Sequence, residues 1–213
     1  MTYPPLPLDR DLSGYHAAEP AVRWPNGAQL AVSVVVNIEE GAELSLAAGD
    51  ASNEFIYEAV ERVEGSRDLC MESHYAYGTR RGWGRIRNAL SAHGVHATLN
   101  ACGRALHHSP WIAAEAVADG HEVSSHGWRW ERQVNMPEAE ERQVIARAVA
   151  AITASAGTPP VGWHTRSATS INTRRLLLEH GGFLYDSNAY DDDTPYMAEI
   201  AGREIVVLPY AFD

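Results

Sequence analysis

The sequence predicts a single α/β domain, a distorted and incomplete (β/α) barrel. Segments with the composition of strands alternate with segments that have the composition of helices, which implies parallel strands joined by right-handed crossovers. Polar residues gather directly after the strand segments, where a barrel of this kind places its active site. The sequence stops after an apolar strand segment, so we expect fewer strands than a closed barrel requires.

The first expected strand is the apolar run from Leu30 to Val36. It is rich in valine and bounded by glycines, a pattern typical of a strand that is buried on both faces of a sheet. Glu39 and Glu40 follow it directly and should lie at its C-terminal end. Because neighbouring side chains on extended backbone point in opposite directions, we expect the two carboxylates to have unequal surroundings. Such a pair can supply one base and one metal ligand or charge-stabilising group.

The remaining segments continue the alternation. The helix ends are marked by glycines that close helices, by a proline that begins one helix and by an acidic first turn in another. The expected helices are 82–94, 110–120, 136–156 and 171–182. The expected strands are 95–101, 121–125, 183–187 and 204–210. No internal repeat interrupts this pattern, so we expect one domain over 1–213, with residues 1–27 as a leader arm packed on it.

Composition excludes several classes of function. The 213 residues carry a formal net charge of −11 with acidic and basic residues interspersed, which opposes binding to nucleic acid or to anionic membranes. All 17 basic residues are arginine, so lysine Schiff bases, pyridoxal phosphate and lysine-based phosphate loops are excluded. The sequence contains neither a secretory leader nor an apolar run that could cross a bilayer. A cytoplasmic location is therefore expected.

His126 is the histidine that most strongly indicates chemistry. It lies between Ser125 and Gly127 at the end of an expected strand, which is typical of a polar rim rather than a core. One helical turn later, where a metal site would place a second histidine, the chain has Trp130. Two aromatic and polar segments, 71–84 and 161–170, are consistent with a pocket for a small planar ligand. They are equally consistent with loops packed by their own aromatic residues.

Ten short blocks, in order along the chain, resemble the polysaccharide deacetylase-like superfamily, and within it the branch of allantoinases and related cyclic-imide hydrolases. The blocks are RDLSGY, RWPNGA, NIEEGAE, MESHYAYGTR, GHEVSSHGW, NMPEAEER, GWHT, SINTRRLL, GGFLYDS and DDDTPY. The resemblance implies a barrel of the polysaccharide deacetylase type. It also implies that this sequence lacks the usual C-terminal elements and a later segment that carries a histidine.

The resemblance assigns roles to two short motifs. Asn37 to Glu40 fall on the family motif Thr-Phe-Asp-Asp, which implies that Glu39 is the general base and Glu40 a metal ligand. His126 matches the first histidine of the motif His-Ser/Thr-x-x-His and is implied as a catalytic residue and a metal ligand, whereas Trp130 replaces the second histidine. Tetrahedral zinc in an enzyme requires three protein ligands and an open position, and Glu40 and His126 supply only two. No cofactor is therefore firmly implied, although zinc bound at a site with one ligand missing is still an open alternative.

The same resemblance implies a set of substrate-binding residues. They are Asn37, Tyr77, Arg80, Trp130, Trp163, His164 and Arg166. Trp130 can present a flat apolar wall to a ring. The segment that matches the family's Tyr-Thr-Gly reads His164-Thr165-Arg166, which leaves the identity of the substrate open.

The expected function is hydrolysis of a C–N bond in a cyclic amide, such as a cyclic imide, a hydantoin-like ring or a ureide ring such as allantoin. Glu39 would accept a proton from the attacking water, while His126, with Arg166 or a backbone donor, would stabilise the oxyanion. Three alternatives stay open: a carbohydrate N-deacetylase, one subunit of a two-chain hydrolase whose partner completes the barrel, and a non-catalytic binding subunit. The resemblance alone implies a homo-oligomer. A companion subunit is expected in the two-chain alternative, because an exposed apolar edge beside residues 204–210 would invite association.

Overall fold

The structure is a computed structural model that describes residues 14–16, 18–56 and 61–210. The chain divides into two compact units, Met1–Val32 and Ser33–Asp213. The described part of the first unit contains one short 3-10 turn, η1 (Pro25–Gly27). All the other elements belong to the second unit. The packing of residues 1–27 on the barrel stays a prediction.

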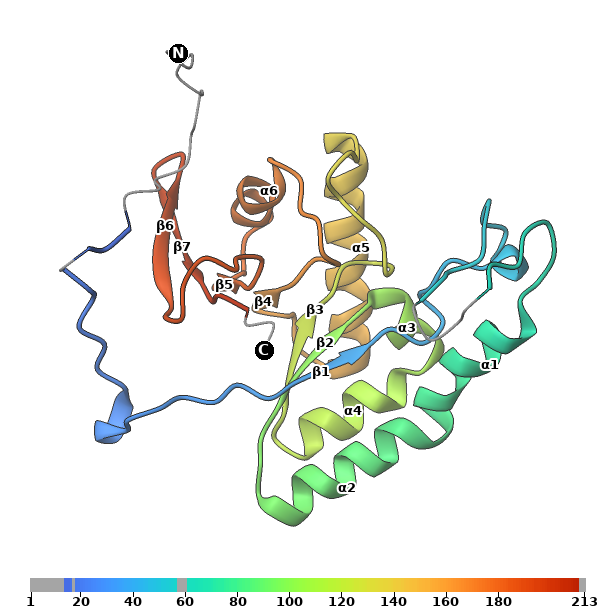
Figure 1. Ribbon diagram of the computed structural model, residues 1–213, viewed down its shortest axis with the longest axis horizontal. Helices are drawn as coiled ribbons and strands as arrows, with labels where there is room; N and C mark the ends of the chain where they lie inside the picture. Colours follow the sequence, from blue (N-terminus) through green and yellow to red (C-terminus); the bar gives the residue numbers. More distant parts are fainter. Residues whose placement is uncertain (1–13, 17, 57–60, 211–213) are drawn as a thin grey trace, which may run out of the picture. The chain divides into compact units, whose positions relative to one another are not determined.

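A mostly parallel sheet of seven strands organises the second unit (Figure 1). Its order is β1-β2-β3-β4-β5-β7-β6, and only the β6–β7 pair is antiparallel. The strands are β1 (Val35–Ile38), β2 (Thr98–Ala101), β3 (Glu122–Ser125), β4 (Gly162–Trp163), β5 (Tyr185–Asp186), β6 (Tyr196–Ile200) and β7 (Arg203–Val207). Among the described residues the sheet is not closed, and β1 and β6 form its edges. The predicted α/β fold with an incomplete barrel is therefore confirmed.

Helices connect the parallel strands. They are α1 (Leu69–Tyr77), the π-helical segment η3 (Gly78–Gly82), α2 (Trp83–His93), α3 (Gly103–His108), α4 (Pro110–Ala118), α5 (Glu138–Ala156) and α6 (Thr173–His180), with a 3-10 turn η2 (Leu46–Ala48) after β1. The predicted boundaries hold where the capping chemistry is strong. Gly94 ends α2 with a left-handed backbone, Pro110 begins α4, and α5 carries three glutamates in its first turn.

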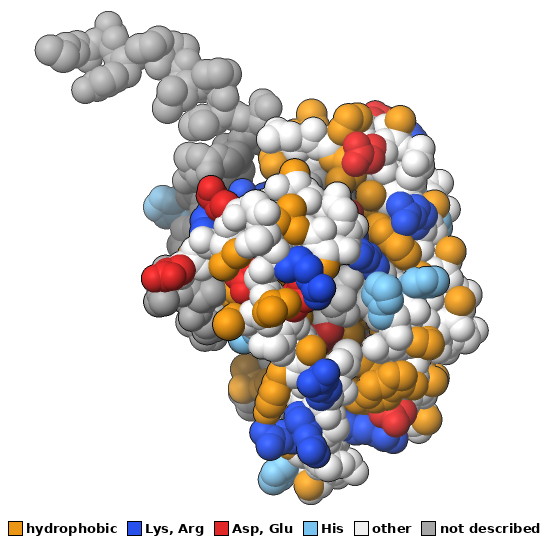
Figure 2. All heavy atoms as spheres, turned by 90° about the vertical axis from the view of Figure 1, so that its right-hand side faces the viewer, with side chains coloured by type: hydrophobic (Ala, Val, Ile, Leu, Met, Phe, Trp, Pro, Cys, Tyr) orange, Lys and Arg blue, Asp and Glu red, His pale blue; other side chains and the backbone are white. Residues whose placement is uncertain are grey.

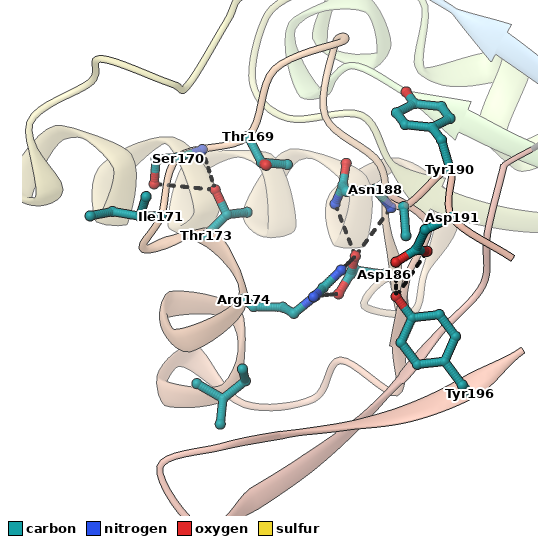
Figure 3. Close-up of a pocket in the computed structure, with 12 residues that line it drawn as sticks. Thr169, Ser170, Ile171, Thr173, Arg174, Asp186, Asn188, Tyr190, Asp191 and Tyr196 are labelled. Atoms are coloured by element: carbon teal, nitrogen blue, oxygen red, sulfur yellow. Dashed lines mark hydrogen bonds and ion pairs between the residues drawn. The ribbon is translucent and has the colours of Figure 1, made fainter. Parts of the chain in front are cut away.

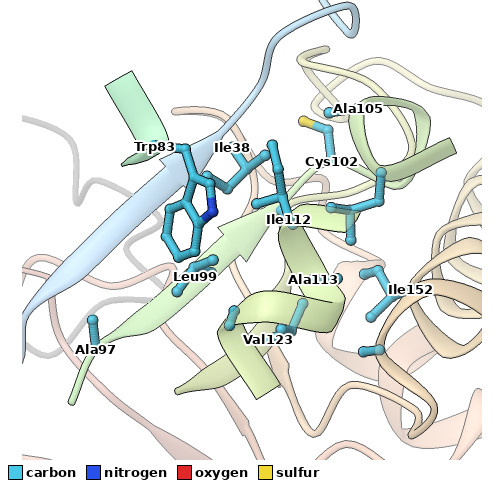
Figure 4. Packing of buried hydrophobic residues seen from close by; sticks show 14 of the residues in the cluster. Ile38, Trp83, Ala97, Leu99, Cys102, Ala105, Ile112, Ala113, Val123 and Ile152 are labelled. Atoms are coloured by element: carbon cyan, nitrogen blue, oxygen red, sulfur yellow. The ribbon is translucent and has the colours of Figure 1, made fainter. Parts of the chain in front are cut away.

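The two faces of the sheet differ in chemistry. On one face, side chains of β1, β2 and β3 join side chains of the helices in a buried apolar cluster (Figure 4). The cluster includes Ile38, Leu99, Ala101, Val123, Trp83, Ile112 and Ile152. Because successive side chains on a strand alternate, the intervening residues point to the opposite face. Asn37, Thr98, Asn100, Glu122 and Ser124 make that face polar.

The first strand differs from the prediction. It spans Val35–Ile38 rather than Leu30 to Val36, and Leu30 and Val32 lie outside it with 72% and 75% of their surface exposed. β1 is an edge strand with a hydrogen-bonded neighbour on one side only, so Val35 is half-buried instead of buried on both faces. A continuous apolar run does not distinguish an edge strand from a central one.

The sequence does not predict α1, α3, β4 or β6. A loop is one of the two interpretations of segment 71–84, but the backbone there is helical and runs from α1 through η3 into α2. A Cβ atom at Gly78 would lie 1.6 Å from a carboxylate oxygen of Glu40, so glycine is needed for close approach rather than for a loop. β6 and β7 form a hairpin through Ala201 and Gly202, both with positive φ, as a two-residue turn of this kind requires.

The molecular surface mixes charges and apolar groups. On the face shown in Figure 2, basic and acidic side chains are interspersed, and apolar patches are broken up by polar atoms. Several exposed charges are paired, for example Arg142 with Glu138. In the described part of the chain, none of the helices has the length and apolar character that a bilayer crossing requires.

Tyr185 lies across the polar face of the sheet in space that Gly162 leaves free. The Tyr185 hydroxyl donates to a Glu122 carboxylate oxygen at 3.0 Å, and the Thr98 hydroxyl donates to the other oxygen at 2.8 Å. A Cβ atom at position 162 would lie 2.1 Å from the Tyr185 ring. Burial, and then the charge of Glu122, raise the pKa of Tyr185, so the phenol remains a neutral donor.

We predict that Gly162→Ala destabilises the protein by about 1–3 kcal/mol, because the added methyl group displaces Tyr185. Gly84→Ala is the matched control, since Gly84 is exposed in α2 with nothing within 4 Å of its would-be Cβ; it should stabilise by up to about 1 kcal/mol. Urea denaturation measures both. Equal stability of Gly162→Ala and the parent chain would contradict the packing described.

Candidate active site

Glu39 and Glu40 point to different surroundings at the end of β1. A carboxylate oxygen of Glu39 lies 3.1 Å from Nε2 of His126. The Glu40 carboxylate lies against the backbone of Gly78 and accepts the Glu39 N–H at 3.1 Å. Burial is the main reason why the pKa of Glu40 is raised. The backbone turns just after β1, and the two carboxylates have the unequal surroundings expected from the sequence.

The hydrogen bonds of His126 fix where its protons can be. Nδ1 lies 2.7 Å from the His164 carbonyl oxygen, which can only accept, so Nδ1 carries a hydrogen. Nε2 faces the Glu39 carboxylate, and this contact also needs one proton. His126 and Glu39 therefore share one proton, either as an imidazolium and a carboxylate or as a neutral pair. The ring is 3% exposed, which strengthens the coupling between the two groups.

His164 lies next to His126 because β3 and β4 are paired. The register joins Ser125 to Trp163, and the His164 N–H donates to the Ser125 carbonyl at 2.8 Å. The two imidazole rings stack with centroids 5.3 Å apart, and Tyr210 stacks on the other side of His164 at 4.7 Å. Nδ1 of His164 donates to the Ser187 carbonyl at 2.8 Å. Burial, and then the positive charge of His126, lower the pKa of His164 to about 4.

Trp130 is covered by an arginine. The guanidinium carbon of Arg166 lies 3.5 Å from the centre of the Trp130 ring, and Tyr75 approaches that ring edge-on. Arg166 forms a bidentate ion pair with Glu54 at 2.8 and 3.0 Å, and Glu54 is 6% exposed. One face of Trp130 therefore packs against Arg166, and the charge of Arg166 is paired with Glu54.

The other predicted substrate-binding residues lie in varied places. Asn37 is exposed on β1. Tyr77 is half exposed on α1 and accepts a hydrogen bond from Arg85. Arg80 is exposed in η3. Trp163 is fully buried in the second apolar cluster, with Leu176 and Phe183, because alternation along β4 sends its ring to the opposite face from His164. The structure joins Glu39, His126 and His164 by direct contacts, and it stacks Arg166 on Trp130. Trp163 is a core residue instead of a pocket residue.

Three residues of the site are not found by sequence reasoning: Glu54, Tyr75 and Tyr210. A sequence pattern could have identified Tyr75, because Met71 and Tyr75 are one helical turn apart and form the buried face of α1. Glu54 and Tyr210 carry no such pattern. Their positions depend on long-range contacts with Arg166 and His164.

The donor set does not fit a tetrahedral zinc site. Zinc in an enzyme takes three protein ligands, and the described residues include no group of three or more His, Cys, Asp or Glu side chains that could hold a metal ion. Nε2 of His126 faces Glu39, whereas the Glu40 carboxylate lies against Gly78. Trp130, in the place of the second histidine, offers no lone pair.

A separate cavity of about 530 Å³ lies between α6 and the loop after β5 (Figure 3). Asp186 is at its centre and accepts hydrogen bonds from Arg174 and Asn188. Tyr196 donates to Asp191 on the other side. Neither Glu39 nor His126 lines this cavity.

An open, mostly parallel sheet with a histidine–carboxylate pair at the carboxyl ends of its strands defines an α/β protein of the incomplete-barrel class. The chain belongs to the polysaccharide deacetylase family. The sequence profile of that family matches residues 71–182. A Schizosaccharomyces pombe protein with the name polysaccharide deacetylase is 34% identical over 96% of this chain and 70% of its own length. The resemblance inferred from the sequence is confirmed.

Two solved structures are similar over nearly the whole chain. The structure of PuuE allantoinase is 39% identical, with a TM-score of 0.89, over 98% of this chain and 70% of that one. A Pseudomonas aeruginosa PAO1 protein that also has the name polysaccharide deacetylase is 42% identical, with a TM-score of 0.88, over 97% of this chain and 70% of that one. The family thus includes proteins named for two different reactions.

We predict that His164 makes the protein less stable as the pH falls from about 6.5 to about 4. The unfolded chain binds a proton on this imidazole near its ordinary pKa of 6.5, whereas the folded chain does so only near pH 4. Acidification through this window therefore favours the unfolded state, by a total on the order of 3 kcal/mol. The loss should be smaller in His164→Asn, which keeps a donor for Ser187. Urea denaturation at pH 7, 5.5 and 4 checks this, and parallel pH profiles of the two proteins would refute it.

Proposed function

We propose that this protein hydrolyses a C–N bond in a cyclic amide, such as a cyclic imide, a hydantoin-like ring or a ureide ring such as allantoin. The observation that carries the proposal is the Glu39–His126 pair, 3.1 Å apart, in which one proton is shared and the second nitrogen of His126 is anchored. The similarity to the PuuE allantoinase structure at 39% identity supports a ring substrate.

In this mechanism Glu39 is the general base. A water oxygen adds to a ring carbonyl carbon while a water proton passes to the Glu39 carboxylate. The carbonyl oxygen becomes an oxyanion, which the Nε2–H of His126 stabilises. When the C–N bond breaks, the carbonyl re-forms and the departing nitrogen takes up the proton that Glu39 received. The products are an open-chain acid and a new N–H group, and Glu39 is regenerated.

His126 is better placed than Arg166 to stabilise the oxyanion. Both oxygens of Glu54 engage Arg166, and the Trp130 carbonyl accepts a further hydrogen bond from it at 3.0 Å. His126 keeps a fixed orientation, because Nδ1 is bound to a carbonyl and the ring stacks on His164. Neutral His164 supports that orientation without adding a second positive charge beside His126.

A carbohydrate N-deacetylase is the second candidate. The family name and the names of two similar proteins favour it. Both candidate reactions add water to a carbonyl carbon and break its bond to nitrogen, so hydrolysis of a C–N bond is common to them. The acetamide of an amino sugar is acyclic, whereas Trp130 and Arg166 form a flat wall suited to a planar ring.

The open sheet supports a further proposal about assembly. Among the described strands β1 has no partner on its outer side, and it carries Asn37 and leads into Glu39. A companion subunit or a second copy of this chain could pair with that edge. Analytical ultracentrifugation of the purified protein tests for a second copy, and a purely monomeric, active chain would exclude a need for either.

We predict that Glu39→Gln lowers kcat by about 10²- to 10⁴-fold, because the amide cannot accept the water proton. Glu131→Gln is the matched control. Glu131 is also a partly buried glutamate, but the ring nitrogens of His126 face Glu39 and the His164 carbonyl rather than Glu131, so its replacement should leave kcat within about threefold. Unchanged turnover in Glu39→Gln would remove Glu39 from the mechanism.

The substrate class is tested with a panel of allantoin, succinimide, hydantoin and dihydrouracil, with and without a chelator. We expect ring opening of at least one compound, and we expect the rate to survive chelation because the donor set does not fit zinc. Loss of activity on chelation, restored by added zinc, would contradict the second expectation. Release of acetate from an N-acetylated amino-sugar oligomer, with every ring left intact, would favour the deacetylase.

A further inference from the structure

The cavity between α6 and the loop after β5 has the size of a small-molecule site. Its volume of about 530 Å³ lies within the range of about 300–1,000 Å³ that is typical of ligand pockets. Its walls come from residues 169–174 and 186–191 and from β6 (Figure 3). Neither Glu39 nor His126 lines it, so the proposed mechanism leaves this space unused.

Arg174 lines the cavity with part of its guanidinium unpaired. Its Nε and Nη2 atoms donate to the Asp186 carboxylate at 2.6 and 3.3 Å, which occupies one side of the group. Nη1 has no hydrogen-bond partner among the described residues, and the Arg174 side chain is 31% exposed. The Nη1–Nη2 end of a guanidinium can bind a carboxylate through two parallel hydrogen bonds. Arg174 can therefore bind a second carboxylate while it keeps Asp186.

Asp191 supplies hydrogen-bond acceptors in the same cavity. Its two carboxylate oxygens share one donor, the Tyr196 hydroxyl, at 3.1 and 3.3 Å. A hydroxyl donates a single hydrogen, whereas an ionised carboxylate has about four acceptor positions. Asp191 is also exposed, so it can accept N–H groups from a ligand. In Figure 3, Asp186 lies between Arg174 and the Asp191–Tyr196 pair.

The two charged groups select a ligand with two different ends. Arg174 favours a carboxylate, whereas Asp191 repels a carboxylate and accepts the N–H groups of an amide or a urea. A simple acid leaves Asp191 without a donor, and a simple amide leaves Arg174 without an anion. The ligand that satisfies both is an amido acid, a small molecule with a carboxylate at one end and an amide or urea N–H at the other.

We propose that this cavity binds an amido acid. Arg174 binds its carboxylate, and Asp191 accepts its N–H hydrogens. The proposal rests on the proposed function only for the origin of the ligand. Addition of one water across the C–N bond of succinimide gives succinamate, and the same reaction of hydantoin gives N-carbamoylglycine. Both products are amido acids.

The test measures binding by calorimetry with the unmodified protein. The probes are N-carbamoylglycine and succinamate. The comparison compounds are butyrate, which has only the carboxylate, and butyramide, which has only the amide. We expect each probe to bind about tenfold or more tightly than either comparison compound. Thermal unfolding without ligand gives the stability of each variant.

Asp191→Asn and Asp193→Asn are a matched pair. Both aspartates are exposed in one acidic run, but of the two only Asp191 lines the cavity. Asp191→Asn should weaken the binding of both probes about three- to tenfold, because hydrogen bonds to a charged acceptor are the stronger ones. Butyrate should bind to this variant as well as before or more tightly, since the repelling charge is gone. Asp193→Asn should leave the binding of both probes unchanged.

Arg174→Lys and Arg175→Lys are a second matched pair. The two arginines are adjacent on α6, and each is 31% exposed and ion-paired, but Arg175 does not line the cavity. Lysine keeps a positive charge for Asp186 but lacks the planar fork, so Arg174→Lys should weaken the binding of both probes about tenfold. Arg175→Lys should not change it. If Arg174→Lys does not fold, the aspartate pair decides the test.

Two results would overturn the proposal. If the probes bind and neither Asp191→Asn nor Arg174→Lys weakens that binding, the amido acid lies outside the cavity. If neither probe binds more tightly than butyrate and butyramide, the cavity does not select an amido acid. Ring opening by the unmodified protein tests the proposed function separately, so both of these results leave the proposed function standing.

Discussion

The alternation of side chains along β1, β2 and β3 is the constraint on which the rest of the structure depends. One set of residues packs against the helices in the apolar cluster, and the other set forms a polar face. Just past the end of β1 the backbone turns at Glu39–Ala42, where Glu39 faces His126 and Glu40 lies against the backbone of Gly78. A slip of one residue in any of these strands would bury the polar set against the helices, so stability and the geometry of the site are specified together.

Two bidentate arginine pairs hold the loop after β1 against the site. Arg129 binds Asp50 at 2.7 and 2.6 Å, and Arg166 binds Glu54 at 2.8 and 3.0 Å. Trp130 follows Arg129 in the sequence and lies under Arg166. Bidentate pairs fix orientation as well as distance, and partly buried ones specify an arrangement more than they add stability. Segments far apart in the sequence are therefore held in one arrangement around Trp130.

Trp130 changes the chemistry of the family motif in which it lies. A second histidine there would add a metal ligand, whereas the indole adds an apolar wall that an arginine covers. The nitrogen of His126 that could bind a metal instead faces a carboxylate. At this site His126 and Glu39 share one proton, and burial keeps His164 neutral. Relatives named for different reactions share this fold, so the fold alone does not identify the substrate.

The sequence by itself determined the alternation of helices and strands, the open parallel sheet and the two positions, Glu39 and His126, that meet in the structure. These depend on local patterns: apolar periodicity, helix caps and polar residues at strand ends. Only the tertiary structure decided that β1 is an edge strand, that Trp163 is a core residue and that Arg166 is engaged by Glu54. The physical reason is that burial, ion pairing and register depend on residues distant in the sequence, for which a short segment carries no pattern.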